Sequence, residues 1–318
     1  MIEGIPRISV LIISYKQENL IKRAINSLLT QRDYIYEICV SDDCSPDNTW
    51  LVLQEYAKQY PGLFKLHRNE PNLGIFQNIE YTWSMPTGDI ICRLAGDDEC
   101  GTGWFNKVVD FIKANKIDYK NELFCIYGDH ICIYPKGDSY VKHNISIKKY
   151  PNDALKLAFR GLISNRGACF SIKVLHKFEK VSQGRSHIAE FLQDRQLQMY
   201  AQKNYYIPSI GNIYYSGIGV SAHLDEKLLN ERKKIRPYAV NYMESKGIKI
   251  RNSEKYFGKY IAAAADFGSR RTMSNFCSAL FYFIVSFDVR YSFLGDNLRH
   301  YLFAIKRRLP HSKPIMFS

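Results

Sequence analysis

The stretch ISVLIISYKQENLIKRAINSLLTQ, residues 8–31, decides the fold class of this chain. Its first seven residues are mostly apolar and β-branched, which is typical of a strand buried in a parallel sheet. From Glu18 to Gln31 the apolar residues recur at helical spacing, so an amphipathic helix is predicted to follow. A buried strand that leads directly into a helix is the repeating unit of α/β proteins.

The same unit recurs along the first hundred residues. Further strands are predicted at residues 35–41, 64–68 and 89–94, and helices at 45–60 and 76–85. Ser45 and Pro46 suit the start of the first of these helices, with Ser45 as its N-cap. The alternation predicts an α/β domain of Rossmann-like architecture, in which helices flank a mostly parallel sheet.

Beyond residue 100 the pattern is less regular. Strands are predicted within residues 124–134 and 205–215, and helices at 151–160 and 188–203. After residue 222, segments rich in Lys and Arg alternate with apolar ones. We therefore expect an α/β domain over residues 1–222 and a basic, mainly helical extension over residues 223–318.

The charge of the chain indicates an anionic partner. Its 318 residues include 44 Lys and Arg against 31 Asp and Glu, a formal net charge of +13. No acid occurs from Asn297 onward, and residues 298–309 have the pattern of a basic amphipathic helix, which can bind an anionic membrane surface. Alternatively, this helix packs on the α/β domain or pairs with a second chain. The longest apolar run, residues 276–287, is too short to cross a bilayer.

The N-terminal residues and the cysteine spacing bear on where in the cell the protein is expected to be. The residues before Ile8 do not resemble a signal peptide, and the eight cysteines have no paired spacing that would suggest a disulfide framework or a zinc site. Together with the basic tail, these features predict a cytoplasmic protein that contacts the inner face of the cytoplasmic membrane peripherally.

Two pairs of acids follow predicted strands. Asp42 and Asp43 end one strand, and Asp97 and Asp98 follow another within the stretch RLAGDDECG, residues 93–101. In open α/β sheets, ligands bind at the carboxyl ends of the strands. Carboxylates there can hold a divalent cation on a diphosphate or accept hydrogen bonds from a base or ribose. Alternatively, they are solvated surface acids or helix caps.

Four segments in order resemble the family 2 glycosyltransferases of the GT-A fold. They are residues 8–31, the stretch IYEICVSDDCSPDNT (residues 35–49), the segment Asn72–Gly74 and the stretch GDIICRLAGDDE (residues 88–99). The resemblance covers about residues 7–222 and implies an inverting transferase of the bacterial glycan-biosynthesis type. It implies that the turn Ser14-Tyr15, together with Asp42 or Asp43, holds the base and ribose of a nucleotide-diphosphate sugar. It extends the donor-binding set to Glu18, Asn72, Gly74, Arg93 and Asp97.

The same resemblance implies a divalent metal, Mn²⁺ or Mg²⁺, on the donor diphosphate. Relatives commonly carry Leu-Asp-x-Asp-Asp at this point, whereas this chain has Leu94-Ala95-Gly96-Asp97-Asp98. Because the first acid is missing, the metal role is expected to fall on Asp97, with Asp98 second.

The stretch HIAEFLQDRQLQMY, residues 187–200, is similar to the family's segment Glu-Asp-x-x-Leu, which carries the catalytic base. The resemblance places Asp194 at the base position, with Glu190, one helical turn earlier, as the competing candidate. The alternative is that Asp194 is an exposed helix acid paired with a neighbour. Further on, YYSGIGVS (residues 214–221) lacks the Arg and His that relatives often place over the diphosphate.

The leading hypothesis is therefore a hexosyl- or N-acetylhexosaminyltransferase. It would move a sugar from a nucleotide-diphosphate sugar, with UDP as the foremost nucleotide, to a glycan or lipid-linked glycan. The alternatives are a nucleotidyltransferase and a non-catalytic protein that binds nucleotide sugars. A nucleotidyltransferase should have a Gly-rich loop after its first strand, but SYKQENL, residues 14–20, has no Gly. No nucleic-acid-binding motif is present, and the sugar, acceptor and oligomeric state stay open.

Overall fold

The computed structural model describes residues 5–159, 163–180, 187–218, 238–250, 252, 255, 256, 259 and 273–285. The chain divides into two compact units. Unit 1 comprises Met1–Asn152, Ser164–Arg185 and Gln196–His223. Unit 2 comprises Asp153–Ile163, Ser186–Arg195 and Leu224–Ser318, so it includes two short segments from the first two hundred residues.

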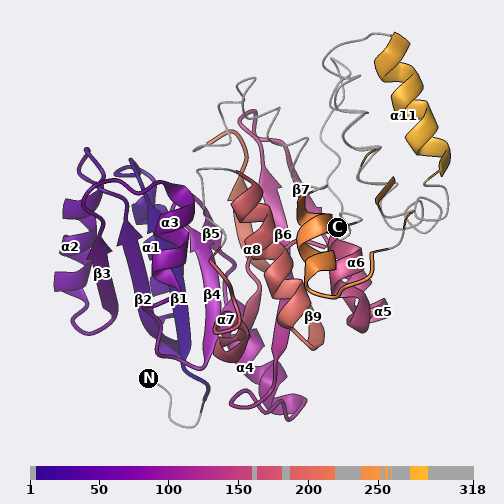
Figure 1. Ribbon diagram of the computed structural model, residues 1–318. Helices are drawn as coiled ribbons and strands as arrows, with labels where there is room; N and C mark the ends of the chain where they lie inside the picture. Colours follow the sequence, from indigo (N-terminus) through magenta and orange to yellow (C-terminus); the bar gives the residue numbers. More distant parts are fainter. Residues whose placement is uncertain are drawn as a thin grey trace. The chain divides into compact units, whose positions relative to one another are not determined.

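Unit 1 is built on one sheet, drawn as arrows in Figure 1. The order of its described strands is β3-β2-β1-β4-β8-β6-β9-β5, with β7 paired to β6. The strands are β1 (Ile8–Ser14), β2 (Ile35–Asp42), β3 (Phe64–Arg68), β4 (Ile90–Ala95), β5 (Glu99–Cys100), β6 (Phe124–Ile133), β7 (Ser139–Lys142), β8 (Cys169–Ser171) and β9 (Lys203–Tyr215).

The first four long strands run parallel and bring their carboxyl ends to one edge. In β1, Ser14 lies beside Asp42 of β2, while Ile13 lies beside Ala95 of β4. β3 continues the parallel order on the other side of β2. The antiparallel strand β8 then separates this half from the parallel pair formed by β6 and β9. The expected α/β class with a mostly parallel sheet is confirmed.

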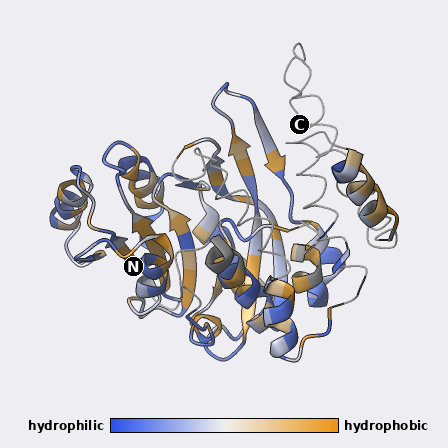
Figure 2. Cartoon of the chain, turned by 45° about the horizontal axis from the view of Figure 1, so that its top comes forward, coloured by the Kyte–Doolittle hydropathy of each residue, from blue (hydrophilic) through white to orange (hydrophobic). Residues whose placement is uncertain are grey.

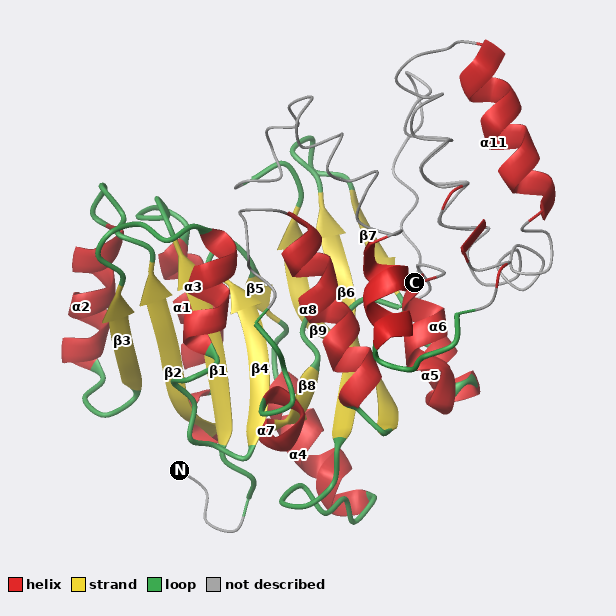
Figure 3. Cartoon of the chain, in the orientation of Figure 1, coloured by secondary structure: helices red, strands yellow, loops and turns green. Residues whose placement is uncertain are grey.

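Helices flank this sheet, as the red ribbons of Figure 3 show. Those of unit 1 are α1 (Ile21–Leu29), α2 (Thr49–Gln59), α3 (Ile75–Thr82), α4 (Trp104–Ala114), α5 (Ser146–Lys149) and α7 (Ile172–Leu175), with a 3₁₀ turn at Arg32–Tyr34. Unit 2 contains α6 (Ala154–Phe159), which follows the 3₁₀ turn Pro151–Asp153, and α11 (Met273–Val285). The helix α8 (His187–Tyr200) crosses the boundary between the units after Arg195.

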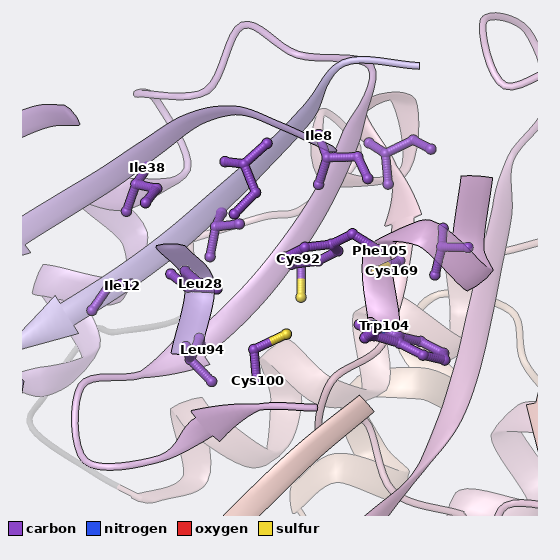
Figure 4. Packing of buried hydrophobic residues seen from close by; sticks show 14 of the residues in the cluster. Ile8, Ile12, Leu28, Ile38, Cys92, Leu94, Cys100, Trp104, Phe105 and Cys169 are labelled. Carbon is purple, nitrogen blue, oxygen red and sulfur yellow. The ribbon is translucent and has the colours of Figure 1, made fainter. Parts of the chain in front are cut away.

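The amphipathic pattern of α1 buries one face of that helix against the sheet. Ile21, Ala24, Ile25 and Leu28 are fully buried and join strand residues such as Ile12 in the main hydrophobic cluster. Figure 4 shows part of this cluster, and Figure 2 shows the apolar residues along the strands. Each large aliphatic side chain removed from water contributes about 1.5–3 kcal/mol, so the helix is fixed beside the carboxyl end of β1.

The predicted helix over residues 45–60 begins later than expected. α2 starts at Thr49, and Ser45 is not its N-cap. Instead, the backbone N–H and the hydroxyl of Ser45 both donate to the carboxylate of Asp42, at 2.9 and 2.5 Å. The N-cap is Asn48, which makes no side-chain capping hydrogen bond, and the N–H and hydroxyl of Thr49 donate to Oδ1 of Asp47. A buried carboxylate nearby thus competes successfully for the Ser45 donors.

Candidate functional site

The parallel strands gather the predicted donor-binding residues at one edge of the sheet. Ser14 ends β1 and Asp42 ends β2, while Asp97 and Asp98 follow β4, which ends at Ala95. Since β1 pairs with both neighbours, the two acid pairs lie on either side of the β1 end. Sequence-distant acids are therefore brought together, as expected from the strand order.

Asp42 is fully buried and holds several loops together. Its carboxylate accepts a hydrogen bond from the hydroxyl of Ser14 at 3.1 Å, besides those from Ser45. Arg68 of β3 pairs with its Oδ2 at 3.6 Å. A buried carboxylate that is paired and hydrogen-bonded in this way is compensated for its loss of hydration. Asp42 consequently fixes the β1 turn, the β2 turn and β3 relative to one another.

Asp43, 2% exposed, organises the segment that precedes α3. Its Oδ1 accepts hydrogen bonds from the Asn69 amide and the Leu73 N–H, at 2.9 and 2.8 Å. Its Oδ2 accepts one from the Gly74 N–H at 2.8 Å. Asn72 donates to the backbone carbonyl of Asp43 at 2.7 Å. The predicted residues Asn72 and Gly74 thus form one hydrogen-bonded unit with Asp43.

The remaining predicted donor-binding residues differ in exposure. Tyr15 is 42% exposed at the strand edge. The carboxylate of Glu18 accepts a hydrogen bond from the Asn48 N–H at 2.9 Å, which joins the β1 turn to the start of α2. Arg93 lies inside β4, beside Leu11 of β1, with its guanidinium 5.8 Å from the ring centre of Phe170. Arg93 is thus a strand residue rather than part of the loop after the strand.

Asp97 and Asp98 lie in the turn between β4 and the short strand β5. Asp98 is 2% exposed, and burial raises its pKa to about 6, against the lowering effect of the Arg166 charge. Burial also raises the pKa of Asp97. The preceding residue, Gly96, packs closely against the side chain of Gln17, since a Cβ at this position would lie 2.2 Å from Oε1 of Gln17. The turn therefore presents two partly desolvated carboxyl groups at the ligand-binding edge.

Two arginines that the sequence patterns did not single out flank these acids. Arg166 pairs with Oδ2 of Asp98 at 3.3 Å and stacks on the ring of Tyr214, 3.6 Å from its centre. Arg23 of α1 pairs with Glu99 at 3.5 Å and stacks on Tyr215, 3.5 Å from its centre. The tyrosine hydroxyl of Tyr215 donates to Glu99. Glu99, which directly follows Asp98, is thus held by Arg23 and Tyr215.

The side chains at this turn fit a metal that is shared with a diphosphate. Among the described residues, no group of three or more His, Cys, Asp or Glu side chains could hold a metal ion. A Mg²⁺-like ion on a nucleotide needs only one or two protein carboxylates, because phosphate oxygens and water complete its coordination. Asp97 and Asp98 supply these carboxylates, although Asp98 also has Arg166 as an ion-pair partner.

The two candidate bases lie in α8. Asp194 is partly exposed and belongs to the part of this helix that is assigned to unit 2. Glu190 lies one helical turn earlier in the same part. In unit 1, the last turns of the helix are tied to the preceding segment, since the Gln196 amide donates to the carbonyl of Glu179 at 2.9 Å.

Comparison with known families identifies the domain. Residues 9–160 match the model of glycosyl transferase family 2. The chain carries a family 2 glycosyltransferase domain. The matching range includes both acid pairs and ends before α8. The predicted resemblance is confirmed for this part of the chain.

Curated relatives of this glycosyltransferase domain are similar over short ranges. An uncharacterized protein of Mycobacterium tuberculosis is 34% identical over 91 residues, 28% of this chain and 26% of that protein. The Bacillus subtilis protein EpsE, named as a glycosyltransferase, is 31% identical over 111 residues, 35% of this chain and 40% of that protein. The chain thus aligns with less than half of the length of either relative.

Solved structures share the glycosyltransferase fold over a longer range. TarS of S. aureus, residues 1–349, has a TM-score of 0.57 at 15% identity and covers 88% of this chain and 80% of that one. The same protein with UDP-GlcNAc gives a TM-score of 0.57 at 14% identity, over 87% and 79% of the two chains. GalNAc-T7 with UDP, GalNAc and Mn²⁺ has a TM-score of 0.51 at 18% identity, over 82% and 52%.

Proposed function

We propose that this protein transfers a hexosyl or N-acetylhexosaminyl group from a nucleotide-diphosphate sugar to a glycan or lipid-linked glycan, with inversion at the anomeric carbon. The observation that carries the proposal is the meeting of two acid pairs beside the end of β1, within a family 2 domain. UDP is the nucleotide we favour, because structural neighbours were solved with UDP-GlcNAc or with UDP and GalNAc.

In this proposal, the Asp42 and Asp43 networks build the nucleoside pocket. Asp42 fixes the turn that carries Tyr15, and Asp43 fixes the segment that contains Asn72 and Gly74. Tyr15 is exposed at the edge, where its ring can stack on a base. Glu18 fixes the adjoining turn from the other side, through its hydrogen bond from Asn48. Arg93, within β4, supports the sheet beneath the site.

Asp97 and Asp98 are the residues that would hold Mn²⁺ or Mg²⁺ against the diphosphate. Such an ion, when bound, neutralises the negative charge that the leaving nucleoside diphosphate acquires. The third acid, Glu99, is excluded from this role in the proposal, because Arg23 and Tyr215 already hold its carboxylate.

Asp194 is our choice for the general base. A single displacement with inversion needs one carboxylate to accept the proton of the acceptor hydroxyl as its oxygen attacks the anomeric carbon. The base then carries the proton while the nucleoside diphosphate leaves with the bonding electron pair. Glu190, one turn earlier in α8, is the alternative.

A nucleotidyltransferase is the competing enzyme class, and a screen separates it from a glycosyltransferase. The purified full chain is incubated with UDP-, GDP- and dTDP-sugars and Mn²⁺, and released nucleoside diphosphate is measured beside thermal stabilisation. We expect one sugar nucleotide to raise the melting temperature and to release its nucleoside diphosphate. A ligand at 100 times its Kd adds about 2.7 kcal/mol to the free energy of unfolding. Turnover of nucleoside triphosphates with pyrophosphate release, without any sugar-nucleotide turnover, would contradict the proposal.

We also propose that the protein contacts an anionic membrane peripherally. The residues 298–309 that first suggested this lie outside the described part of the chain. The described helix α11 supports it, because one face exposes large apolar side chains, each at least 45% exposed: Met273, Phe276, Leu280, Phe281 and Ile284. Among the described residues, no helix is long and apolar enough to cross a bilayer.

The membrane proposal is tested by sedimentation with anionic and neutral vesicles. The full chain is compared with the double variant Leu280→Glu and Phe281→Glu, which adds two charges to the exposed face of α11. We expect the full chain to sediment with anionic vesicles and the variant to bind at least tenfold more weakly. Equal sedimentation of both proteins would contradict a role for this face.

A further inference from the structure

We propose that Arg166 binds the diphosphate of the sugar donor. This inference rests on the proposed function, since it names a phosphate-binding residue within that site. The segment Tyr214–Ser221 contains no Arg, Lys or His. Arg166 comes from a different part of the chain, the loop before β8, yet its guanidinium lies on the ring of Tyr214.

The position of Arg166 places its charge beside the two strand-end acids. Its Nη1 lies 3.3 Å from Oδ2 of Asp98, the residue next to Asp97. An arginine has five N–H donors in a planar fork that matches the oxygens of a phosphate group. The side chain is 38% exposed, so a ligand can reach it, while Tyr214 covers one face of its guanidinium.

The backbone that carries Arg166 is held firmly. Asn144 forms hydrogen bonds with both backbone groups of Ser164, accepting from its N–H at 2.8 Å and donating to its carbonyl at 3.0 Å. Gly167, which directly follows Arg166, has a φ of 68°, and a Cβ there would lie 2.5 Å from the backbone of Gly211. The loop therefore packs directly on β9, which also carries Tyr214 and so orients the guanidinium.

Arg23 provides a matched comparison on the other face of the sheet. Successive residues of a strand point to opposite faces, so Tyr214 and Tyr215 of β9 carry their stacked arginines on opposite sides. Arg23 comes from α1 and pairs with Glu99, and its Nη2 donates to the backbone carbonyl of Asp97 at 2.5 Å. Both arginines stack on tyrosine equally closely, but only Arg166 pairs with Asp98, one of the two acids assigned to the diphosphate end.

The test compares UDP with uridine, which has the same nucleoside but no phosphate. Affinities of the full chain are measured by titration calorimetry, once in EDTA and once with Mn²⁺. For Arg166→Gln we expect UDP to bind about 10- to 100-fold more weakly, the usual effect of losing a charged hydrogen bond, with uridine unchanged. Arg166→Lys keeps the charge without the fork and should give a smaller loss. Arg23→Gln should weaken UDP binding less than Arg166→Gln does, because Arg23 pairs with Glu99 rather than with Asp98.

A second comparison separates contact with phosphate from an effect through Asp98. Removing Arg166 leaves Asp98 without its ion-pair partner, and this free carboxylate would itself repel a diphosphate. The double variant Asp98→Asn with Arg166→Gln is therefore compared with Asp98→Asn alone, in EDTA. Weaker UDP binding by the double variant supports a direct contact. Equal UDP binding would overturn the proposal, as would unchanged UDP affinity in Arg166→Gln.

The outcomes distinguish this inference from the proposed function. If the unaltered chain binds UDP and turns over a UDP-sugar while both Arg166 comparisons give no loss, the function stands and the assignment of Arg166 falls. If the unaltered chain binds neither UDP, GDP nor dTDP, the proposed function fails and this inference fails with it.

Discussion

Two acid pairs lie on either side of the end of β1, but their carboxylates differ in the hydrogen bonds that they accept. The carboxylates of Asp42 and Asp43 accept hydrogen bonds from side chains and backbone N–H groups of at least three different segments. At the other pair, the Asp98 carboxylate contacts Arg166 and the Tyr215 N–H, both at 3.3 Å, and accepts a hydrogen bond from the side chain of Asn212. The hydrogen bonds to the first pair measure 2.5–3.1 Å, whereas the two contact distances at Asp98 are longer, and burial raises the pKa of Asp98 to about 6.

This difference indicates different roles for chemically identical groups. Carboxylates that are saturated with protein donors stabilise loops and have little capacity left for a ligand. Carboxylates that are buried and only weakly hydrogen-bonded are costly unless a cation or ligand joins them, and a pKa raised by burial is typical of functional sites. We therefore expect substitutions at Asp42 and Asp43 to reduce stability, whereas substitutions at Asp97 should reduce activity.

The largest effect is expected at Asp194, which belongs to neither pair. Asp194→Asn keeps the size of the side chain but removes the proposed base, so kcat should fall by about 10²- to 10⁴-fold with unchanged donor affinity. Steady-state kinetics and UDP titration measure the two quantities. Glu190→Gln is the control and should cost much less; if it abolishes transfer while Asp194→Asn does not, Glu190 is the base.

The next effect is expected at Asp97. Asp97→Asn removes a carboxylate from the proposed metal site, so Mn²⁺-dependent turnover should fall by about 10²- to 10³-fold while the urea midpoint changes little. Glu99→Gln is the matched control, because Glu99 is already held by Arg23 and Tyr215. Full turnover by Asp97→Asn, or full turnover of the unaltered chain in excess chelator, would remove the metal from the mechanism.

Asp43→Ala should act mainly on stability. It leaves the N–H groups of Leu73 and Gly74 and the amide of Asn69 without their acceptor. Leaving such buried donors unpaired should lower the free energy of unfolding by about 3 kcal/mol, measured by urea denaturation. Asp43→Asn, which retains one acceptor oxygen, should lose less. If Asp43→Ala unfolds at the same urea concentration as the unaltered chain, the proposed division between the two pairs is wrong.

The smallest effect on stability is expected at Glu37 in β2, another acid whose carboxylate accepts several hydrogen bonds. Burial raises its pKa, but hydrogen bonds from Lys65, Ser9 and Thr87 outweigh burial, and the net pKa lies below the ordinary value of 4.5. Its stabilising contribution is therefore present above pH 4.5 and is lost as the pH falls through the folded-state pKa. Glu37→Gln should lower the free energy of unfolding by about 1 kcal/mol at pH 7 and flatten its decline in acid. A parallel pH profile in the two proteins would contradict this assignment.

Much of the sheet could be predicted because its pattern is local. The expected bounds of β1 and β3 agree with the structure, and β2 extends one residue further, to Asp42. Seven consecutive residues of buried strand leave a clear signal in the sequence. By contrast, β5 and β8 have two and three residues, too few for any periodicity, and tertiary pairing alone makes them strands.

Some residues of the candidate site could likewise be predicted from the sequence, and others could not. Asp97 and Asp98 could be selected from the sequence, since acids after a buried strand of a parallel sheet lie where ligands bind. Arg166 could not, because 68 residues separate it from Asp98, and no local pattern marks an arginine that pairs across that distance. Ser45 was expected to cap α2 from its local sequence, but the buried carboxylate of Asp42 binds it instead.

The sequence by itself therefore determined the α/β class, the family resemblance and the strand ends at which acids gather, because hydrophobic periodicity and short motifs act within a few residues. Tertiary structure decided which acids are held by short hydrogen bonds and which by longer contacts, since that depends on donors from distant segments such as Asn69, Tyr215 and Arg166. Hydrogen bonds and ion pairs require approach within a few ångströms, and only the folded chain brings those groups together.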